Sequence, residues 1–266
     1  ELPAPQLEDR WESLVFDDAI PQRLLDYTIT LASFSDRNVD QSLVSWNRVA
    51  LLHGEPGTGK TTLCKALAQK AAIRLGGACA LCEVNTHSLF SKWFSESGKL
   101  VKQAFSRILT EIEADRIFVL VDEVESLTAS RAAAANSNGA EPTDAIRVVN
   151  AVLTELDRLA RDPRVIVLTT SNITGAIDAA FVDRADIKQY IGPPSARAIY
   201  AILVSCIQEL AKRGIINDNV EFEDSRNVQD WMLSDESRIL KSLAERCVGM
   251  SGRTLRRLPF IATALF

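Results

Sequence analysis

The hydrophobic pattern of the chain alternates between short apolar runs and longer segments with a helical period. Three runs are typical of buried strands: RVALLHG, RIFVLVDE and RVIVLTTSN. The second is continuously apolar and β-branched, as expected of a central parallel strand covered on both faces. A further strand is expected around residues 82–84, and helices are expected at about 21–34, 61–73, 98–112 and from Pro142 onward. This alternation predicts an α/β fold with an open, doubly wound parallel sheet.

The pattern changes after the segment IGPPSARA. Pro193 and Pro194 can neither continue a strand ladder nor lie inside a helix, so they mark a boundary. Beyond them, helices are expected at about 199–212, 234–247 and 252–266, and the segment 217–230 is polar. We therefore expect a linker or the stub of a longer protein at 1–12, a large α/β domain at 13–194 and a small helical lid domain at 195–266.

Composition narrows the class of protein. The 266 residues are 47% hydrophobic and carry a net charge of −5, so a dedicated nucleic-acid binder with a basic stripe is not expected. No apolar run approaches the roughly 18 residues of a spanning helix, and no signal peptide opens the sequence, which favours a soluble intracellular protein. Five irregularly spaced cysteines favour reduced thiols, and Cys79 and Cys82 have no second pair to complete a zinc site.

The segment GEPGTGKT fits the pattern G-x-x-x-x-G-K-[ST] at each fixed position and lies between a predicted strand and a predicted helix. Backbone N–H groups of such a loop can surround phosphate oxygens, and the following helix N-terminus adds partial positive charge. We expect Lys60 to reach the β- and γ-phosphates of ATP and the Thr61 hydroxyl to coordinate Mg²⁺. The predicted nucleotide-binding residues are Gly54, Glu55, Pro56, Gly57, Thr58, Gly59, Lys60, Thr61 and Thr62.

Acidic residues follow the second predicted strand. Asp122 stands where it can hold Mg²⁺ through water, and Glu123 can orient and polarise the attacking water as a general base. Asn172, at the end of VIVLTTSN, could place the same water, although a turn-forming asparagine is the structural alternative. Together with the phosphate loop, these residues predict ATP hydrolysis.

Two neighbouring aromatic residues, Trp93 and Phe94, stand in SLFSKWFSESGK, a segment otherwise rich in Ser, Lys and Glu. The segment lacks the alternation of a half-buried strand. Two interpretations are open: a loop that tucks one ring into a core, or a loop that grips a passing ligand.

Taken in this order, the motifs resemble those of an AAA+ ATPase, and more closely those of the pachytene checkpoint protein / thyroid hormone receptor-interacting protein family. The resemblance runs from about Trp11 to the end of the chain. It rests on WNRVALLHGEPGTGKTTLCKALAQ, HSLFSKWFSESGKLV, VLVDEVESLTASR, EPTDAIRVVNAVLTELD, VLTTSNIT, AFVDRADIKQYIGPPSA and GMSGRTLRRLPF.

The resemblance implies a homo-hexameric ring that uses ATP to remodel HORMA-domain proteins of the spindle checkpoint and the meiotic chromosome axis. Such a motor pulls its substrate through a central pore, works with an adaptor, and acts in the nucleus and cytosol, with no direct nucleic-acid or membrane contact expected. Trp93 would then grip the substrate, Phe94 would grip it or anchor the loop, and a second pore loop would lie near 131–139. A rigid ring suits this task because it gains apolar contact without demanding hydrogen-bond partners.

Two arginines gain roles from the same resemblance. Arg184 in AFVDRAD matches the arginine finger that reaches the γ-phosphate bound in the adjoining subunit, and its structural alternative is an ion pair with Asp183 or Asp186. Arg253 in MSGRTL matches the arginine that the lid offers to the nucleotide of its own subunit, and an ordinary helix arginine is the alternative.

Departures from the family keep other functions open. Glu55 stands where the family usually has proline, and no segment corresponds to the family's N-terminal substrate- and adaptor-binding domain.

A nucleic-acid motor or clamp loader on the same scaffold is the main alternative function, and it predicts salt-sensitive DNA binding. A phosphate-loop kinase and a non-catalytic nucleotide-gated scaffold are further alternatives.

Overall fold

The computed structural model describes most of the chain, and its contacts divide the chain into two units. The described residues are 1–16, 18–85, 97–126, 142–172, 179–216, 222–223 and 234–265. The first unit, here the sheet unit, comprises Glu1–Glu8, Pro21–Gly54 and Lys60–Tyr190. The second, here the lid unit, comprises Asp9–Ile20, Glu55–Gly59 and Ile191–Phe266.

The sheet unit is built on five parallel strands in the order β2-β3-β4-β1-β5. Every residue of β4 and the five middle residues of β3 are buried, because helices cover both faces of the sheet. The predicted parallel α/β sheet is thus confirmed. The strands are β1 (Val49–His53), β2 (Cys79–Asn85), β3 (Arg116–Asp122), β4 (Val165–Ser171) and β5 (Ile187–Tyr190).

The sequence pattern did not reveal β5. Its four residues are IKQY, in which half-buried positions alternate with exposed ones. Because β5 lies at the edge of the sheet and pairs with β1 alone, it needs no apolar run. An edge strand of this length therefore gives almost no hydrophobic signal.

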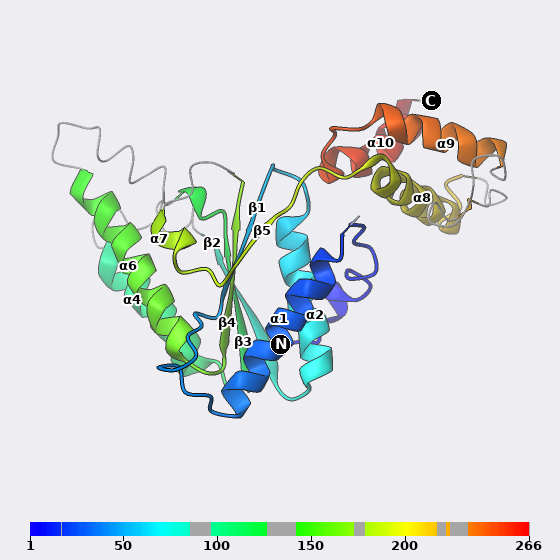
Figure 1. The fold of residues 1–266 in the computed structure, drawn as a ribbon. Helices are drawn as coiled ribbons and strands as arrows, with labels where there is room; N and C mark the ends of the chain where they lie inside the picture. The colour runs from blue at the N-terminus through cyan, green and yellow to red at the C-terminus, as the bar shows by residue number, and fades with distance from the viewer. Residues whose placement is uncertain are drawn as a thin grey trace. The chain divides into compact units, whose positions relative to one another are not determined.

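Helices cover the two faces of the sheet in pairs (Figure 1). On one face lie α1 (Ile20–Asp36) and α2 (Lys60–Leu75), and on the other lie α4 (Ser97–Glu111) and α6 (Pro142–Arg161). Val101, Phe105 and Ile108 recur at the helical period along α4 and enter the core between α4, α6 and the sheet. All four helices were expected from the sequence. The short helix α7 (Ala179–Val182) was not.

The first residues pack against the sheet unit. The N–H of Leu2 donates to the carbonyl of Cys79 at 2.7 Å, and Leu2 is buried against edge strand β2. The 3-10 helix η1 (Pro5–Leu7) follows, and Ala4 exchanges hydrogen bonds with the side chain of Gln69. Leu2 thus bridges to edge strand β2, η1 packs against α2, and residues 9–12 group with the lid unit. The assignment of residues 1–12 as a linker or stub stays a prediction.

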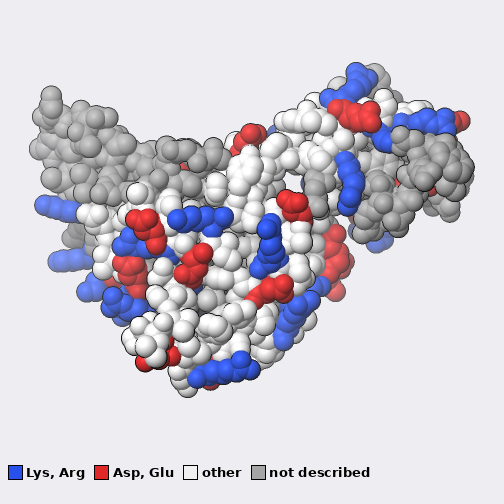
Figure 2. Space-filling model, in the orientation of Figure 1, with Lys and Arg blue, Asp and Glu red and all other residues white. Residues whose placement is uncertain are grey.

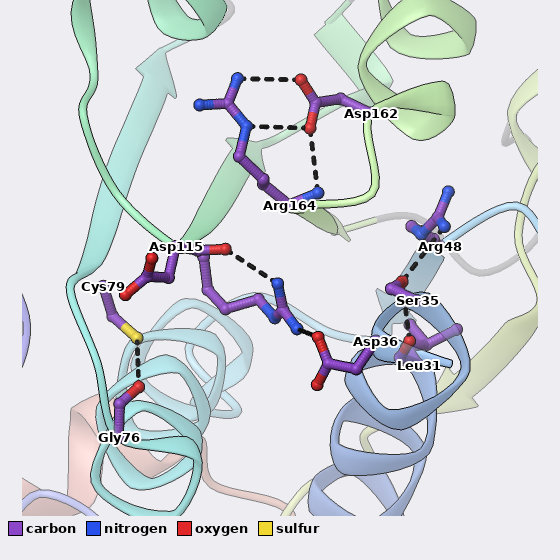
Figure 3. Close-up of polar contacts among 10 residues, drawn as sticks. Leu31, Ser35, Asp36, Arg48, Gly76, Cys79, Asp115, Asp162 and Arg164 are labelled. Carbon is purple, nitrogen blue, oxygen red and sulfur yellow. Dashed lines mark hydrogen bonds and ion pairs between the residues drawn. The ribbon is translucent and has the colours of Figure 1, made fainter. Parts of the chain in front are cut away.

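Ion pairs hold the amino ends of the strands (Figure 3). Arg116, the first residue of β3, contacts Asp36 at the end of α1. Arg164, just before β4, donates to both carboxylate oxygens of Asp162, which follows the last residue of α6. Each pair therefore ties the end of a helix to the start of a strand.

Among the described residues of the lid unit, three helices pack around a small core of their own. They are α8 (Ala196–Lys212), α9 (Asp235–Arg246) and α10 (Gly252–Leu265), all expected from the sequence. Leu203, Leu240 and Leu255, one from each helix, lie in this core. Ser195 and Ser234 accept backbone hydrogen bonds and so cap α8 and α9. Within the described parts of the chain, no helix has the length and apolar character needed to cross a bilayer.

Candidate nucleotide-binding site

The phosphate loop begins at the carboxyl end of β1. His53 is in register with Ser171 at the end of β4, and the N–H of Gly54 donates to the Ser171 carbonyl at 3.2 Å. The ammonium of Lys60, at the start of α2, donates to the carbonyl of Gly54 at 3.0 Å. Lys60 is only 4% exposed, and a buried ammonium requires such an oxygen partner. The loop is thus folded back over the first residue of α2.

Glycine is required at two positions of the loop for different reasons. Gly57 has a φ of +78°, and a Cβ there would lie 2.8 Å from the hydroxyl of Ser251. Its carbonyl also accepts the N–H of Arg253 at 3.2 Å, so the backbone of Arg253 touches the loop within the lid unit. Gly59 has a φ of +97° and open space around it, so there the backbone conformation alone demands glycine.

The remaining loop residues face outward or bond locally. Glu55 and Pro56 are exposed, and the hydroxyl of Thr58 donates to the Glu55 carbonyl at 2.9 Å. Thr62 lies in the first turn of α2 and is half-buried. The loop with its left-handed glycines fits a polyphosphate, since such turns direct backbone N–H groups into an anion-binding concavity.

Thr61 and Asp122 meet beside the loop. The Thr61 hydroxyl donates to Oδ1 of Asp122 at 2.8 Å. The same carboxylate oxygen accepts a short hydrogen bond from the hydroxyl of Thr170 on β4. A hydroxyl and a carboxylate, both hard oxygen ligands, form a donor set that fits Mg²⁺. The pair that the sequence proposed as metal ligands therefore lies together.

Glu123 adopts a backbone conformation that is uncommon for a side chain other than glycine. Its φ is +59°, in the left-handed region. Three contacts hold it: its N–H donates to the Thr170 hydroxyl at 3.1 Å, and its carbonyl accepts from the backbone N–H and the hydroxyl of Ser126 at 3.1 and 2.8 Å. The side-chain amide of Asn172 donates to Oε1 of Glu123 at 3.4 Å. Strain of this kind concentrates at functional sites.

Thr170 is the residue of this site that sequence reasoning missed. Its side chain binds both the carboxylate of Asp122 and the N–H of Glu123. The signal was present in the sequence, because three polar residues in a row, Thr169, Thr170 and Ser171, end a strand that is buried throughout. Buried hydroxyls need partners, and their partners here are functional candidates.

Arg184 lies elsewhere on the sheet unit, just after α7. Its Nε and Nη2 atoms donate to the two carboxylate oxygens of Asp157 on α6 at 2.6 and 2.8 Å, and its Nη1 donates to the Ala180 carbonyl at 2.6 Å. The side chains border a cavity of about 280 Å³ whose lining also includes Trp46, Arg161 and Phe181.

The ion-pair partner of Arg184 differs from the two carboxylates that the sequence offered as alternatives. The side chain of Asp186 accepts hydrogen bonds from the Tyr27 hydroxyl and from the backbone N–H groups of Asn47 and Arg48, each at 2.8 Å. Asp157, which is distant in sequence, binds Arg184 instead. Local sequence could not indicate this pairing.

Two titratable side chains next to the phosphate loop have shifted pKa values. Burial lowers the pKa of His53, and the nearby charge of Lys60 lowers it further. The imidazole is therefore neutral at neutral pH, and its ring packs 5.6 Å from that of Tyr190. Burial raises the pKa of the Cys64 thiol in α2, and the Asp122 carboxylate adds to this rise. Cys64 is thus an unreactive core residue.

The proposed pore residues Trp93 and Phe94, and the second pore loop at 131–139, lie outside the described residues.

The fold and this site together define the class of protein. A parallel sheet with a phosphate loop after β1, and with acidic side chains at the carboxyl end of β3, is the architecture of a phosphate-loop nucleotide-binding protein. Two family models match the chain. Residues 50–193 match the ATPase family associated with various cellular activities (AAA), and residues 195–266 match a TRIP13-like AAA+ ATPase lid C-terminal domain.

Individual relatives narrow the class further. The chain is 54% identical to the pachytene checkpoint protein 2 homologs of Danio rerio and Homo sapiens over its whole length, and it spans 64% and 63% of those two proteins. It also resembles the solved structure of C. elegans PCH-2, with 40% identity and a TM-score of 0.86 over 99% of this chain and 68% of that one. The chain therefore belongs to the pachytene checkpoint protein 2 family of AAA ATPases. The AAA domain of FIGL-1, 20% identical with a TM-score of 0.66 over 97% of this chain and 73% of that one, shares the fold.

Proposed function

We propose that this chain is the ATP-hydrolysing engine of a homo-hexameric motor that remodels HORMA-domain proteins of the spindle checkpoint and the meiotic chromosome axis. The observation that carries the proposal is the hydrogen-bonded arrangement that joins Thr61, at the start of α2, to Asp122, and Glu123 to Asn172. In a member of this family, that arrangement supports hydrolysis rather than nucleotide binding alone.

The proposed chemistry follows from the position of each side chain. Lys60 and the loop N–H groups would bind the phosphates, and Thr61 and Asp122 would hold Mg²⁺. The metal ion would neutralise charge on the phosphates. Glu123 takes the proton of the attacking water as general base, and its hydrogen bond from Asn172 orients the carboxylate toward that water. Thr170 fixes Asp122 and the backbone of Glu123 in one frame.

Two arginines complete the proposed site. Arg184 reaches the γ-phosphate held by the adjoining subunit, so hydrolysis depends on assembly, and guanidinium suits this role because it stays charged and donates in a planar fork. Arg253 contacts the nucleotide of its own subunit, and its backbone contact with Gly57 supports a role beside the phosphate loop. In this proposal the lid thus responds to the nucleotide state.

The substrate side of the proposal rests on family membership. Trp93 would grip an extended polypeptide in the central pore, with Phe94 anchoring the loop or gripping beside it. The partners would be HORMA-domain proteins delivered by an adaptor, in the nucleus and the cytosol. Because the chain spans less than two thirds of its curated relatives, the binding of adaptor and substrate belongs to the full-length protein.

A nucleic-acid motor on the same scaffold is the competing function. On the face that Figure 2 shows, Lys and Arg side chains are interspersed with Asp and Glu side chains over the sheet unit. Neither this mixture of charges nor the net charge of −5 provides the basic surface that a nucleic-acid motor would need. Salt-sensitive binding of DNA by the assembled protein would favour this second function.

The first test removes the proposed base. Glu123→Gln should bind ATP with unchanged affinity and hydrolyse it at least about a hundredfold more slowly, since general-base catalysis contributes about 10²–10⁴. Phosphate release and nucleotide binding would be measured separately on the assembled protein. Glu209→Gln, which removes an exposed ion pair between Glu209 on α8 and Arg213 just beyond it, is the matched control and should retain full turnover. Full turnover by Glu123→Gln would remove Glu123 from the base role.

A further inference from the structure

We infer that Asp157 is a positioning residue for Arg184, so that it controls the arginine that one subunit offers to the nucleotide of the next. The inference rests on the proposed role of Arg184 and extends it to a second side chain. Asp157 itself would touch neither nucleotide nor water. It would act by fixing the direction of the guanidinium.

The contact is bidentate. Nε and Nη2 of Arg184 donate to separate oxygens of Asp157 at 2.6 and 2.8 Å. A side-on pair of this kind fixes the plane of the guanidinium as well as its position. The carbonyl of Ala180 accepts from Nη1 at 2.6 Å on α7. The guanidinium is therefore oriented by two elements at once, α6 and α7.

The two partners differ in how firmly the fold holds them. Asp157 lies on α6, a helix of 20 residues, and follows the buried Leu156 directly. Arg184 lies two residues beyond α7, a helix of only four residues. Asp186 secures the chain beyond it by accepting the backbone N–H groups of Asn47 and Arg48. The carboxylate of Asp157, on the firmly packed α6, therefore fixes the direction of the long Arg184 side chain.

The exposure of the pair points to positioning rather than to folding stability. The side chain of Arg184 is 30% exposed and that of Asp157 is 41% exposed. Ion pairs this open to solvent add little to the free energy of folding. What the pair does restrict is the rotamer freedom of a long side chain, which is large for arginine. Loss of Asp157 should therefore spare the fold and affect the reaction.

The charge of the cavity gives a second reason for a carboxylate at this position. Arg161 lines the same cavity as Arg184, so two arginine residues border one space of about 280 Å³. Asp157 is the one carboxylate among the described residues that line it. Without Asp157, this positively charged lining would lose its neutralising partner, and Arg184 could adopt other rotamers.

The experiment measures ATP turnover of the full-length assembled protein. Asp157→Asn, which keeps the shape of the side chain, should lower kcat about three- to thirtyfold while the KM for ATP stays within about twofold, because ground-state binding is untouched. Glu111→Gln, which removes a comparable Nε-to-carboxylate pair with Arg107 at 2.7 Å on the exposed side of α4, should leave kcat unchanged. Unchanged or raised kcat in Asp157→Asn would overturn the inference.

A double-mutant cycle and subunit mixing separate positioning from a general defect. Adding Asp157→Asn to Arg184→Ala should cause no further loss in single-turnover hydrolysis, because the positioned group is already gone. Mixing Asp157→Asn subunits with Glu123→Gln subunits should restore turnover, since the latter still supply a positioned Arg184 to their neighbours. Additive losses, or no restoration on mixing, would contradict the inference while leaving the role of Arg184 intact. Full turnover in Arg184→Ala alone would instead remove the proposed arginine role itself.

Discussion

The hydroxyl of Thr170 shows how much of the candidate site depends on one small side chain. It donates to Oδ1 of Asp122 and accepts the N–H of Glu123, so it links the proposed metal ligand to the proposed base. Glu123 sits in a left-handed conformation that costs free energy for any residue with a side chain. The hydrogen bond with Thr170 helps to offset this free-energy cost.

Removal of this hydroxyl gives the prediction at the residue scale. Thr170→Val keeps the volume but leaves the Glu123 N–H without this acceptor and the Asp122 carboxylate without one donor. We expect the free energy of unfolding to fall by about 1–3 kcal/mol and kcat to fall at least about tenfold. Urea unfolding and phosphate-release assays measure the two effects.

The neighbouring threonine provides the control. Thr169 is buried on the same strand, and its hydroxyl donates to the Ala50 carbonyl at 3.1 Å rather than to Asp122. Thr169→Val should destabilise the fold without slowing the chemical step. Equal kcat values for the two variants would show that the Thr170 hydroxyl has no special part in the site.

At the scale of elements, α6 carries Asp157, the partner of Arg184, and β4 leads to the proposed nucleotide site. Asp157 lies on α6, while Thr170 lies on β4 and Asn172 just beyond it. A short turn joins the two elements, and in it the carboxylate of Asp162 accepts the backbone N–H, Nε and Nη2 of Arg164 at 2.9, 3.1 and 2.9 Å (Figure 3). These hydrogen bonds therefore hold the end of α6 next to the start of β4.

The turn predicts a pH-dependent loss of stability. The hydrogen bonds from Arg164 lower the pKa of Asp162 below its ordinary value of about 3.9. A carboxylate with a lowered pKa in the folded state adds stability above its unfolded pKa, and this stability is lost as the pH falls through the folded pKa. Asp162→Asn should therefore destabilise the protein by about 1 kcal/mol at pH 7 and by less below about pH 4.

Urea unfolding of wild type and variant at several pH values measures this difference. The exposed pair of Arg107 and Glu111 supplies the control, because Glu111→Gln should change stability little at pH 7. A difference for Asp162→Asn that stays constant between pH 7 and pH 3 would contradict the assignment to the ionised carboxylate.

At the scale of the whole molecule, the proposed function requires subunits and a substrate. Hydrolysis would lie between neighbouring subunits through Arg184, whereas the mechanical step would belong to Trp93 in the pore. These two activities should therefore separate by mutation. The separation distinguishes a protein-remodelling motor from a nucleotide switch.

Trp93→Ala tests this separation in the full-length protein. We expect basal ATP turnover within about twofold of wild type and loss of remodelling, because in this proposal the indole would supply most of the apolar contact with the substrate. Remodelling would be followed by the protease sensitivity of a HORMA-domain substrate in the presence of ATP and adaptor. Lys92→Ala, in the same segment, removes a charge but no ring and should remodel normally. Remodelling at the full rate by Trp93→Ala would contradict the pore role.

The sequence by itself determined those features that depend on neighbours along the chain. Apolar runs marked β1, β3 and β4, helical periodicity marked the long helices, and the spacing of GEPGTGKT marked the phosphate loop. These signals are legible because burial and backbone conformation leave a periodic or glycine-rich trace within a few residues. The short elements β5 and α7 left no such trace.

Only the tertiary structure decided which distant side chains meet. Thr170 reaches Asp122 across 48 positions of sequence, and Arg184 binds Asp157 across 27 in preference to the carboxylates beside it. Each pair joins neighbouring parts of the packed sheet unit, where strand register and helix packing bring polar groups within hydrogen-bond distance. Hydrogen bonds form through space, so their partners depend on how the elements pack rather than on the order of residues along the chain.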